Sequence, residues 1–388
     1  MSHWPAVNIQ PKIAAEQEAR PLRIRRADAI AIAAPLAKPM LMAAETITHA
    51  ENLVLRLEAD NGLVGWGEAT VAPTMTGDTL PGMLAAVRQH MAPLLIGADV
   101  RERAELARRC RASIVHNGGA KAAVEIALLD LAGKHYGVPA VELIGGALRR
   151  SVKNMWLLGN PEIAADITEA KRKVAEGYDY FKLKVGVKKV EAEIEAALQV
   201  RAALGPDMRL CADANCGWDA RTAKQYMRGV ENAGLLFLEQ PLPSDQLDGM
   251  AALNKLGILP ISGDECVGGS EDVLALGQAG VVGGVNLKVI KTEGITPLLA
   301  AATLCQQLGL SVTLAGKVAG TSLTAAATLA AACASPVLDW GASLTQVYLA
   351  QDVVRDPLRL EDGTFSLRDA PGLGVEVDEE AIRRFTVG

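Results

Sequence analysis

A regular succession of short apolar runs, each closed by a charged residue, constrains the fold of this chain most. The closing residues are Lys184, Asp213, Glu239, Asp264 and Lys288, so successive closings lie 24 to 29 residues apart. This is the length of one strand–helix unit in a parallel barrel of typical size. An open doubly wound sheet is the alternative, but it rarely sustains so many consecutive units. We therefore expect an α/β fold with a (β/α) barrel, a modified TIM barrel, over residues 146–355.

The strands of this barrel are predicted from the apolar runs, which alternate with segments of helical periodicity. Catalytic groups gather at the carboxyl ends of barrel strands, so a polar residue that closes an apolar run is a candidate site residue. The expected strands are Phe181–Val185, Arg209–Ala212, Leu235–Leu238, Leu259–Ser262, Gly284–Val289, Ser311–Leu314 and Val337–Trp340.

A different pattern precedes the barrel. Three runs of strand character predict an antiparallel sheet, and residues 80–136 then carry helical periodicity that ends at Gly137 and Pro139. We expect an α+β domain over residues 21–145, after a polar leader at residues 1–20. The three strand runs are Ile24–Ala34, Leu53–Glu58 and Val64–Ala69, the last two joined by the turn Asp60-Asn61-Gly62.

The composition argues against several classes of partner. The 45 acidic and 39 basic residues give a net charge of -6 and are spread along the chain, so no basic face is offered to nucleic acid. No apolar run reaches the roughly 18 to 20 residues that a membrane span needs, and residues 1–20 have no signal-peptide pattern. We expect a cytoplasmic protein without a membrane partner. The six cysteines form no CxxC pair, which favours reduced thiols and gives zinc little support.

Three carboxylates close consecutive strands: Asp213, Glu239 and Asp264. Each of them alone could be the N-cap of the following helix. Together at one rim they repel one another, and a hard divalent cation with oxygen ligands relieves that repulsion. We predict a metal site formed by these three residues, with Mg²⁺ as the best fit and Mn²⁺ as an alternative.

Lysines close strands on both sides of these carboxylates. Lys182 and Lys184 lie two residues apart, so both point from one strand face into the barrel, although an exposed edge strand is the alternative. Lys288 would face Lys184 across the mouth. Burial and a second ammonium lower the pKa of a lysine and make it a general base, so we expect Lys182 to tune Lys184. Lys291 lies beyond its strand, where a surface or helix-capping charge is expected.

These groups together predict a reaction class. A proton beside a carboxylate is too weakly acidic for a lysine alone. Mg²⁺ on the carboxylate oxygens stabilises the ene-diolate that forms when this proton leaves. We therefore expect proton abstraction at the carbon next to the carboxylate of a small substrate.

In this order the motifs resemble those of the enolase superfamily, and within it those of the muconate cycloisomerase (muconate-lactonizing) subgroup. The resemblance covers most of the chain. The matching segments are GWGEA at 65–69, the helix 122–137 with Glu125, Leu129, Asp130 and Gly133, FKLKVG at 181–186, CADAN at 211–215, LEQPL at 238–242, SGDEC at 262–266, NLKVIK at 286–291 and PGLGV at 371–375.

The resemblance implies a role for each matching residue. It implies metal ligation by Asp213, Glu239 and Asp264, and acid/base roles for Lys184 and Lys288 on opposite faces of the substrate. Lys182 would tune Lys184 and touch the substrate carboxylate, while Asn215 and Glu265 would support these groups, Glu265 near Lys288. The resemblance also implies that residues 21–145 are a capping domain with specificity loops near 37–46 and 71–79, that residues 356–388 return to it, and that the protein is a homo-oligomer.

Two features of the sequence reduce the number of activities expected within this superfamily. All five histidines precede the barrel, which argues against the His–Asp base of the mandelate racemase type. In the stretch Ala315–Thr321, the glutamate position of muconate cycloisomerases aligns with Ala319, and no acid lies in this stretch. The paired aspartates of dipeptide epimerases are also missing there. Lys317 would either contact a second anionic group of the substrate or be a loop lysine that faces solvent.

The leading prediction is Mg²⁺-assisted proton transfer at the α-carbon of a small carboxylic acid, which ends in cycloisomerisation or in racemisation or epimerisation. Dehydration of a hydroxy acid through the same intermediate is the first alternative, and loss of water from the product would distinguish it. A non-catalytic carboxylate-binding protein is the second. It is disfavoured because buried lysines opposite a metal are costly to maintain for binding alone.

Overall fold

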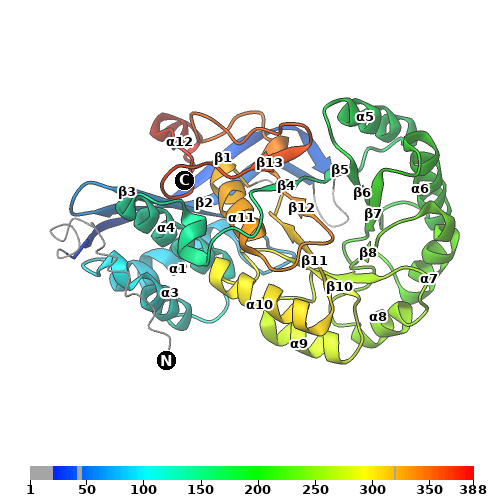
Figure 1. Cartoon of the computed structure of the whole chain (residues 1–388), viewed down its shortest axis with the longest axis horizontal. Helices are drawn as coiled ribbons and strands as arrows, with labels where there is room; N and C mark the ends of the chain where they lie inside the picture. The colour runs from blue at the N-terminus through cyan, green and yellow to red at the C-terminus, as the bar shows by residue number, and fades with distance from the viewer. Residues whose placement is uncertain (1–20, 42–45, 319) are drawn as a thin grey trace, which may run out of the picture.

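The computed structural model of this chain describes residues 21–41, 46–318 and 320–388. The polar leader, part of the first expected specificity loop and Ala319 lie outside the described residues. Figure 1 shows two parts, an N-terminal domain with long strands and a barrel ringed by helices. Among the helices of the described residues, none is long and apolar enough to cross a membrane.

The N-terminal domain is built on an antiparallel sheet in the order β1-β2-β3. Helix α4 (Gly118–Tyr136) packs on β3, and a Cβ at Gly67 would lie only 2.0 Å from the carbonyl oxygen of Ala123. Glycine is therefore required where this strand and helix meet. The strands are β1 (Ile24–Leu41), β2 (Thr46–Ala59) and β3 (Val64–Thr70), so β1 and β2 extend beyond the predicted runs.

Short helices complete this domain. Helix α1 (Leu80–Ala86) begins after Thr79, whose Oγ1 accepts a hydrogen bond from Gly82 N. Helix α4 ends at Gly137, which has a φ of +70° and confirms the predicted glycine cap. The other elements are η1 (Val87–Met91), α2 (Ala92–Leu95), η2 (Val100–Glu102), α3 (Arg103–Ala112) and η3 (Ala140–Ile144).

Eight parallel strands of the described residues form the barrel, in the order β5 to β12. The sheet nearly closes where Met155 N donates to Ala342 O at 2.9 Å. The strands are β5 (Trp156–Leu158), β6 (Tyr180–Lys184), β7 (Arg209–Asp213), β8 (Leu238–Glu239), β9 (Ile261–Gly263), β10 (Gly284–Leu287), β11 (Ser311–Ala315) and β12 (Ala342–Ser343). The alternating helices are α5 (Ile163–Ala175), α6 (Val190–Leu204), α7 (Ala220–Gly229), α8 (Leu247–Asn254), α9 (Ser270–Gln278), α10 (Ile295–Leu308) and α11 (Ser322–Ala334), with the turns η4 (Glu231–Ala233) and η5 (Gln346–Tyr348).

Apolar side chains fill the amino-terminal end of the barrel. Because side chains alternate along a strand, the residue two positions before each inward charged residue also points inward. These residues are Tyr180 before Lys182, Cys211 before Asp213 and Phe237 before Glu239, and they form one buried cluster with Met155 and Trp340. The charged side chains are thereby confined to the carboxyl end of the strands.

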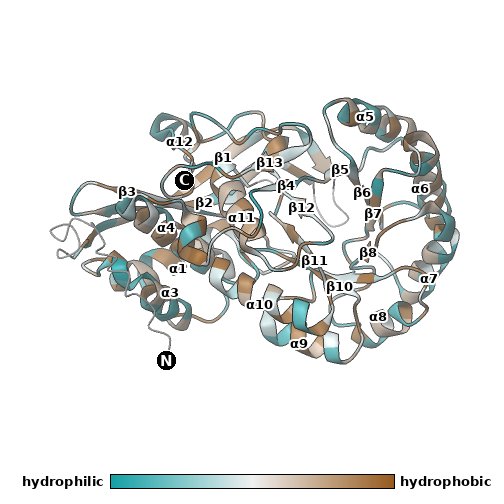
Figure 2. Cartoon of the chain, in the orientation of Figure 1, coloured by the Kyte–Doolittle hydropathy of each residue, from teal (hydrophilic) through white to brown (hydrophobic). Residues whose placement is uncertain are grey.

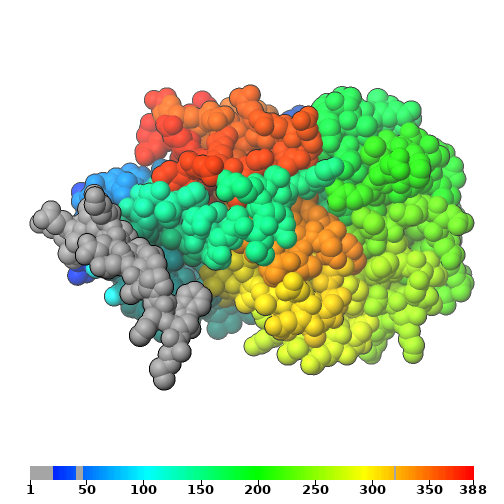
Figure 3. Space-filling model, viewed as in Figure 1, coloured from blue at the N-terminus to red at the C-terminus, as the bar shows by residue number. Residues whose placement is uncertain are grey.

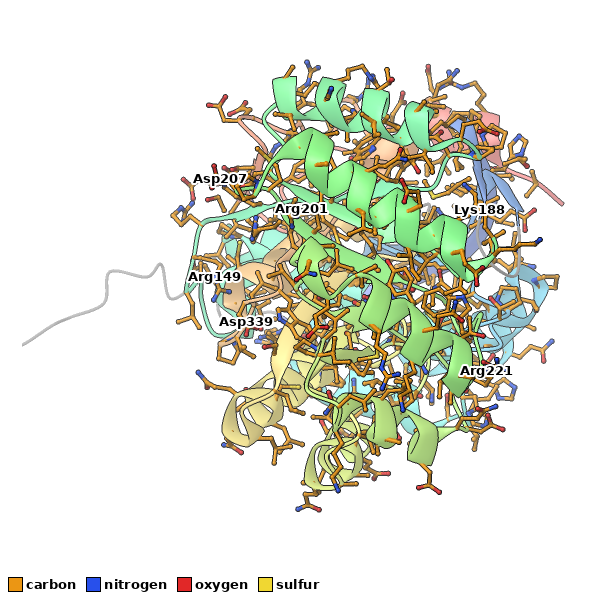
Figure 4. The ribbon with its side chains drawn as sticks, turned by 90° about the vertical axis from the view of Figure 1, so that its right-hand side faces the viewer. Arg149, Lys188, Arg201, Asp207, Arg221 and Asp339 are labelled. Atoms are coloured by element: carbon orange, nitrogen blue, oxygen red, sulfur yellow. The ribbon has the colours of Figure 1, made fainter. Side chains whose placement is uncertain are left out.

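Figure 4 shows the two ends of the barrel from the side, across helices α6 and α7. Lys188, in the loop after β6, lies at one end, and Asp207, in the loop before β7, lies at the other. The helices carry hydrophilic and hydrophobic residues on different faces in Figure 2, as expected for helices packed on a sheet. The end with Lys188 is the one where barrel enzymes carry their active sites.

The prediction for the last strand is wrong. Residues 337–340 form loop and turn, and β12 begins only at Ala342. Asp339 accepts hydrogen bonds from Val312 N and Ser311 Oγ, and Trp340 stacks on Phe237 with ring centroids 4.3 Å apart. Trp340 therefore fills space inside the barrel, and its segment does not extend the sheet. The expected set also lacks β5, the first strand of the barrel.

The last residues return to the N-terminal domain. Strand β13 (Thr364–Ser366) pairs with β4 (Ser151–Lys153), and helix α12 (Glu379–Phe385) lies against β1. Leu373 N, in the PGLG segment, donates to Asp130 of α4 at 2.8 Å. In Figure 3 the last residues, coloured orange to red, lie together along the upper edge of the molecule.

Candidate active site

All nine residues singled out from the sequence line one cavity at the carboxyl end of the barrel strands. The cavity has a volume of about 170 Å³. The strand register brings the charged side chains together, since Lys184 lies beside Asp213 and Asp213 beside Glu239. The nine residues are Lys182, Lys184, Asp213, Asn215, Glu239, Asp264, Glu265, Lys288 and Lys317.

Each of the three strand-end carboxylates is paired with a lysine. Lys184 Nζ lies 2.5 Å from Asp213 Oδ2, and Lys182 Nζ lies 2.7 Å from Glu239 Oε2. Lys288 pairs with Asp264. Strands β7, β8 and β9 separate β6 from β10 in the sheet, so Lys184 and Lys288 approach the carboxylates from opposite sides of the mouth.

The prediction for Lys291 is wrong. Its side chain is buried, and its ammonium donates to Asp264 Oδ1 at 2.6 Å, to Asp264 O at 2.6 Å and to Asn286 O at 2.7 Å. The reason is that the chain turns back into the barrel directly after β10 instead of leaving toward solvent. Lys291 therefore fixes the orientation of Asp264.

Burial and charge move several pKa values in this cavity. Burial raises the pKa of Asp264, but the charges of Lys288 and Lys291 outweigh burial and hold it well below its usual range. Burial and the charges of Asp264 and Asp213 raise the pKa of Glu265 to about 7. Such opposite shifts among neighbouring carboxyl groups are typical of a functional site.

The pKa of Lys182 is raised, unlike that of a lysine that acts as a neutral base. Desolvation lowers the pKa of Lys182, but the charges of Glu239 and Asp213 outweigh it and raise this pKa above its ordinary value. Lys182 therefore holds its positive charge more firmly than a free lysine does. That charge suits contact with an anionic group better than proton abstraction.

Asn215 links Lys184 to Glu265, which follows β9. Asn215 Oδ1 accepts from Lys184 Nζ at 2.7 Å, and Asn215 Nδ2 donates to Glu265 Oε1 at 3.1 Å. Asn215 has a φ of +41°, in the left-handed region that asparagine tolerates better than most residues. Asn215 and Asp213 therefore hold the Lys184 ammonium together.

Two further polar residues of the site are absent from the sequence prediction. Asn286 Nδ2 donates to Glu239 Oε1 at 3.0 Å, and Gln240 Oε1 accepts from Asp264 N at 2.9 Å. Asn286 precedes Lys288 by two residues and so shares its strand face, which is the signal that could have found it. No comparable pattern points to Gln240. It lies just after β8 with a φ of +34°, so the alternation of side chains along a strand does not apply to it.

The donor set suits a hard divalent cation. Asp213, Glu239 and Asp264 offer carboxylate oxygens from adjacent strands, and their side chains are almost fully buried. As the side chains lie, no three histidine, cysteine or carboxylate groups in the described parts of the chain converge on one point as a bound metal would require. The lysine ammonium groups hold the oxygens instead. Oxygen ligands of this kind select Mg²⁺ or Mn²⁺ over softer metals.

The remaining wall of the cavity is less charged. Thr74 and Met75 come from the second loop expected to set specificity, and Leu157 comes from β5. Lys317 follows β11 and is buried against the cavity, so the alternative of a solvent-facing lysine is wrong. Ala319 lies outside the described residues.

Two family models match the two parts of this chain. The model described as mandelate racemase / muconate lactonizing enzyme, N-terminal domain, matches residues 26–145, and the model described as enolase C-terminal domain-like matches residues 165–381. The chain belongs to the mandelate racemase/muconate lactonizing enzyme family. This places it in the enolase superfamily and confirms the predicted fold, a barrel with an N-terminal capping domain.

Curated relatives and solved structures agree on the subgroup. The chain is 31% identical over 361 residues to "Muconate cycloisomerase 1" of Rhodococcus opacus, which covers 91% of this chain and 95% of the relative. It is 30% identical to "L-Ala-D/L-Glu epimerase" of Clostridium acetobutylicum, covering 89% of this chain and 96% of the relative. The muconate lactonizing enzyme from Pseudomonas fluorescens complexed with muconolactone matches with a TM-score of 0.92 at 28% identity, over 95% of this chain and 100% of the other. The protein is thus an isomerase of the muconate cycloisomerase subgroup.

Proposed function

We propose that this enzyme removes the proton next to the carboxylate of a small carboxylic acid, with a divalent cation held by Asp213, Glu239 and Asp264. The observation that carries the proposal is the arrangement of two lysines on opposite sides of three buried carboxylates, within one cavity. Mg²⁺, when bound, would supply positive charge to stabilise the negative charge that develops on the substrate.

The lysines divide the work in this proposal. Lys184 and Lys288 would each reach one face of the α-carbon and exchange a proton with it. Lys182, with its raised pKa, would hold the substrate carboxylate. The buried surroundings exclude water and strengthen each of these charge interactions.

The outcome after proton transfer is either cycloisomerisation or racemisation or epimerisation. Both classes occur among the relatives, which include muconate cycloisomerases and a dipeptide epimerase. Dehydration of a hydroxy acid would use the same first step and is distinguished by water loss.

The deciding experiment is a screen for exchange of α-protons with deuterium. Small carboxylic acids, including muconolactone and dipeptides, are incubated with the enzyme and Mg²⁺ in D₂O and followed by proton NMR. We expect metal-dependent exchange for at least one of them. Absence of exchange across the whole set would contradict the proposed proton abstraction.

A further inference from the structure

Helix α4 of the capping domain contacts the turn that begins at Lys288, the second proposed base. The contacts come from Gly118, Lys121 and Glu125, which lie on one helix face at positions i, i+3 and i+7. A Cβ at Gly118 would lie 2.5 Å from the carbonyl oxygen of Ile290, so the helix backbone sits directly on the turn. Glu125 Oε1 accepts from Thr296 N at 2.9 Å where α10 begins.

The central contact is an ion pair between the two domains. Lys121 Nζ lies 2.8 Å from Glu293 Oε1, with the lysine side chain 4% exposed and the glutamate side chain 32% exposed. A buried ammonium is costly without a partner, so Lys121 requires an anion at this place. Glu293 supplies it from the barrel.

The backbone of Glu293 is strained. It has a φ of +63°, in the left-handed region where glycine is the favoured residue, and Gly294 follows at +146°. A glutamate is kept in this conformation only if its side chain gains something there. The ion pair with Lys121 is the interaction that it gains.

The turn itself is stiff. Thr292 Oγ1 donates to Gly294 O at 3.0 Å, and Gly294 N donates to Val289 O at 3.0 Å. Lys288 and Lys291, which both hold Asp264, lie at the start and middle of this turn. A shift at Glu293 would therefore reach Lys288 instead of being absorbed by the loop.

We propose that Lys121 and Glu293 are positioning residues, whose interdomain ion pair holds the turn 288–294 so that Lys288 faces the substrate. The consequence for catalysis rests on the proposed function. Neither residue lines the cavity, so neither contacts substrate.

The test variant is the double substitution Lys121→Met with Glu293→Gly. Glycine relieves the backbone strain, and methionine avoids leaving an unpaired buried ammonium, so the variant should fold. Glu293→Gln is a milder second variant that keeps the side-chain size. The matched control is Lys38→Met, because Lys38 also joins the two domains, through an ion pair of 2.8 Å with Glu169, but does not contact this turn.

The first measurement is amide hydrogen exchange by mass spectrometry in the presence of Mg²⁺. Peptides covering 288–296 should exchange about tenfold faster in the double variant, less so in Glu293→Gln and unchanged in Lys38→Met. Unchanged protection in the double variant would overturn the proposal. This measurement is independent of any activity.

The second measurement uses the substrate whose α-proton the wild type exchanges fastest. It compares the rates of deuterium exchange on the two faces of that substrate. Exchange on the Lys288 face should slow about tenfold or more while exchange on the Lys184 face stays, since small displacements of a base are costly. General destabilisation would slow both faces equally and would overturn positioning. If the wild type exchanges no α-proton, the proposed function fails, and amide exchange alone decides whether the ion pair holds the turn.

Discussion

At the scale of single residues, the site is a balance of opposite charges. Three strand-end carboxylates face four buried or nearly buried lysines, and each carboxylate has at least one ammonium in contact. Binding of a divalent cation must therefore compete with these ammonium groups. The contribution of each carboxylate to metal affinity can be tested by substituting the three residues one at a time.

Loss of one carboxylate should cost metal affinity without unfolding the protein. We expect Asp213→Ala, Glu239→Ala and Asp264→Ala each to weaken Mn²⁺ binding by about 100-fold or more, since loss of even an outer partner typically costs about 10- to 100-fold. Electron paramagnetic resonance titration with Mn²⁺ measures this, with circular dichroism as the check on folding. Ser343→Ala, in the same cavity wall, is the control and should bind Mn²⁺ like the wild type. Turnover that survives exhaustive chelation would contradict the metal site.

The stereochemistry of proton exchange should distinguish the roles of the two candidate bases, Lys184 and Lys288. If the reaction is racemisation, Lys184→Ala and Lys288→Ala should both abolish interconversion but retain deuterium exchange into opposite enantiomers. If it is cycloisomerisation, one variant should lose exchange and the other should only slow, because only one lysine then moves a proton. Proton NMR in D₂O measures both. Exchange at the wild-type rate in both variants would exclude these lysines as bases.

Ala319 bears on one named substrate. The resemblance implies that Ala319 takes the position where muconate cycloisomerases carry glutamate, and on this alignment we expect cis,cis-muconate to be at best a poor substrate. Steady-state kinetics test this directly. A kcat/KM of roughly 10⁴ M⁻¹s⁻¹ or more would mean that the alignment is wrong or that the acid is dispensable.

At the scale of elements, Glu68 ties β3 to the amino terminus of α11. It accepts backbone hydrogen bonds from Thr321 N at 3.1 Å and Thr324 N at 2.9 Å, and a side-chain hydrogen bond from Asn52 at 2.5 Å. Burial raises the pKa of Glu68, against the hydrogen bonds from Thr324 and Thr321 that lower it. The glutamate of the GWGEA motif therefore caps a barrel helix from the other domain.

Removal of this cap should destabilise the whole protein. Glu68→Gln replaces one acceptor oxygen by an NH₂ group, which donates and cannot accept, so buried donors lose their partner. We expect a loss of roughly 2 to 4 kcal/mol in the free energy of unfolding. Urea denaturation measures it. The exposed Glu105→Gln, which removes a surface pair with Arg108, is the control and should leave the midpoint unchanged; an equally unchanged midpoint for Glu68→Gln would refute the cap.

At the scale of the whole molecule, the domains are joined by charges as well as by apolar packing. Glu169 of α5 accepts hydrogen bonds from Lys38 of β1 at 2.8 Å, from Asn160 at 2.6 Å and from Trp156 Nε1 at 3.2 Å. Burial raises the pKa of Glu169, but the hydrogen bonds from Lys38 and Asn160 outweigh it and lower the pKa below its ordinary 4.5.

This shift predicts a pH dependence of stability. A carboxyl group with a lowered pKa in the folded state contributes stability that is present above about pH 4.5 and is lost as the pH falls through the folded-state pKa. Lys38→Met should therefore destabilise the protein near neutral pH, and the difference from the wild type should shrink below pH 4.5. Thermal unfolding across pH measures this, with the exposed Lys171→Met as control. If the difference in stability between Lys38→Met and the wild type did not change with pH, the lowered pKa of Glu169 would not be due to Lys38.

The sequence by itself determined the barrel, its site-bearing end and the residues that gather there. The reason is local: alternation within β6 puts Lys182 and Lys184 on one face, and the regular unit length puts Asp213, Glu239 and Asp264 on neighbouring strands. These relations depend only on residues close in the chain and on the rule that parallel strands end together.

Only the tertiary structure decided which of these groups pair, and what surrounds them. The burial of Lys291, the packing of Trp340 on Phe237, the amide of Asn286 and the ion pair between Lys121 and Glu293 all join residues whose meeting depends on how turns and domains pack. Periodicity records which face of an element is buried. It does not record where a chain goes after its strand ends, because that path is fixed by contacts with residues far away in sequence.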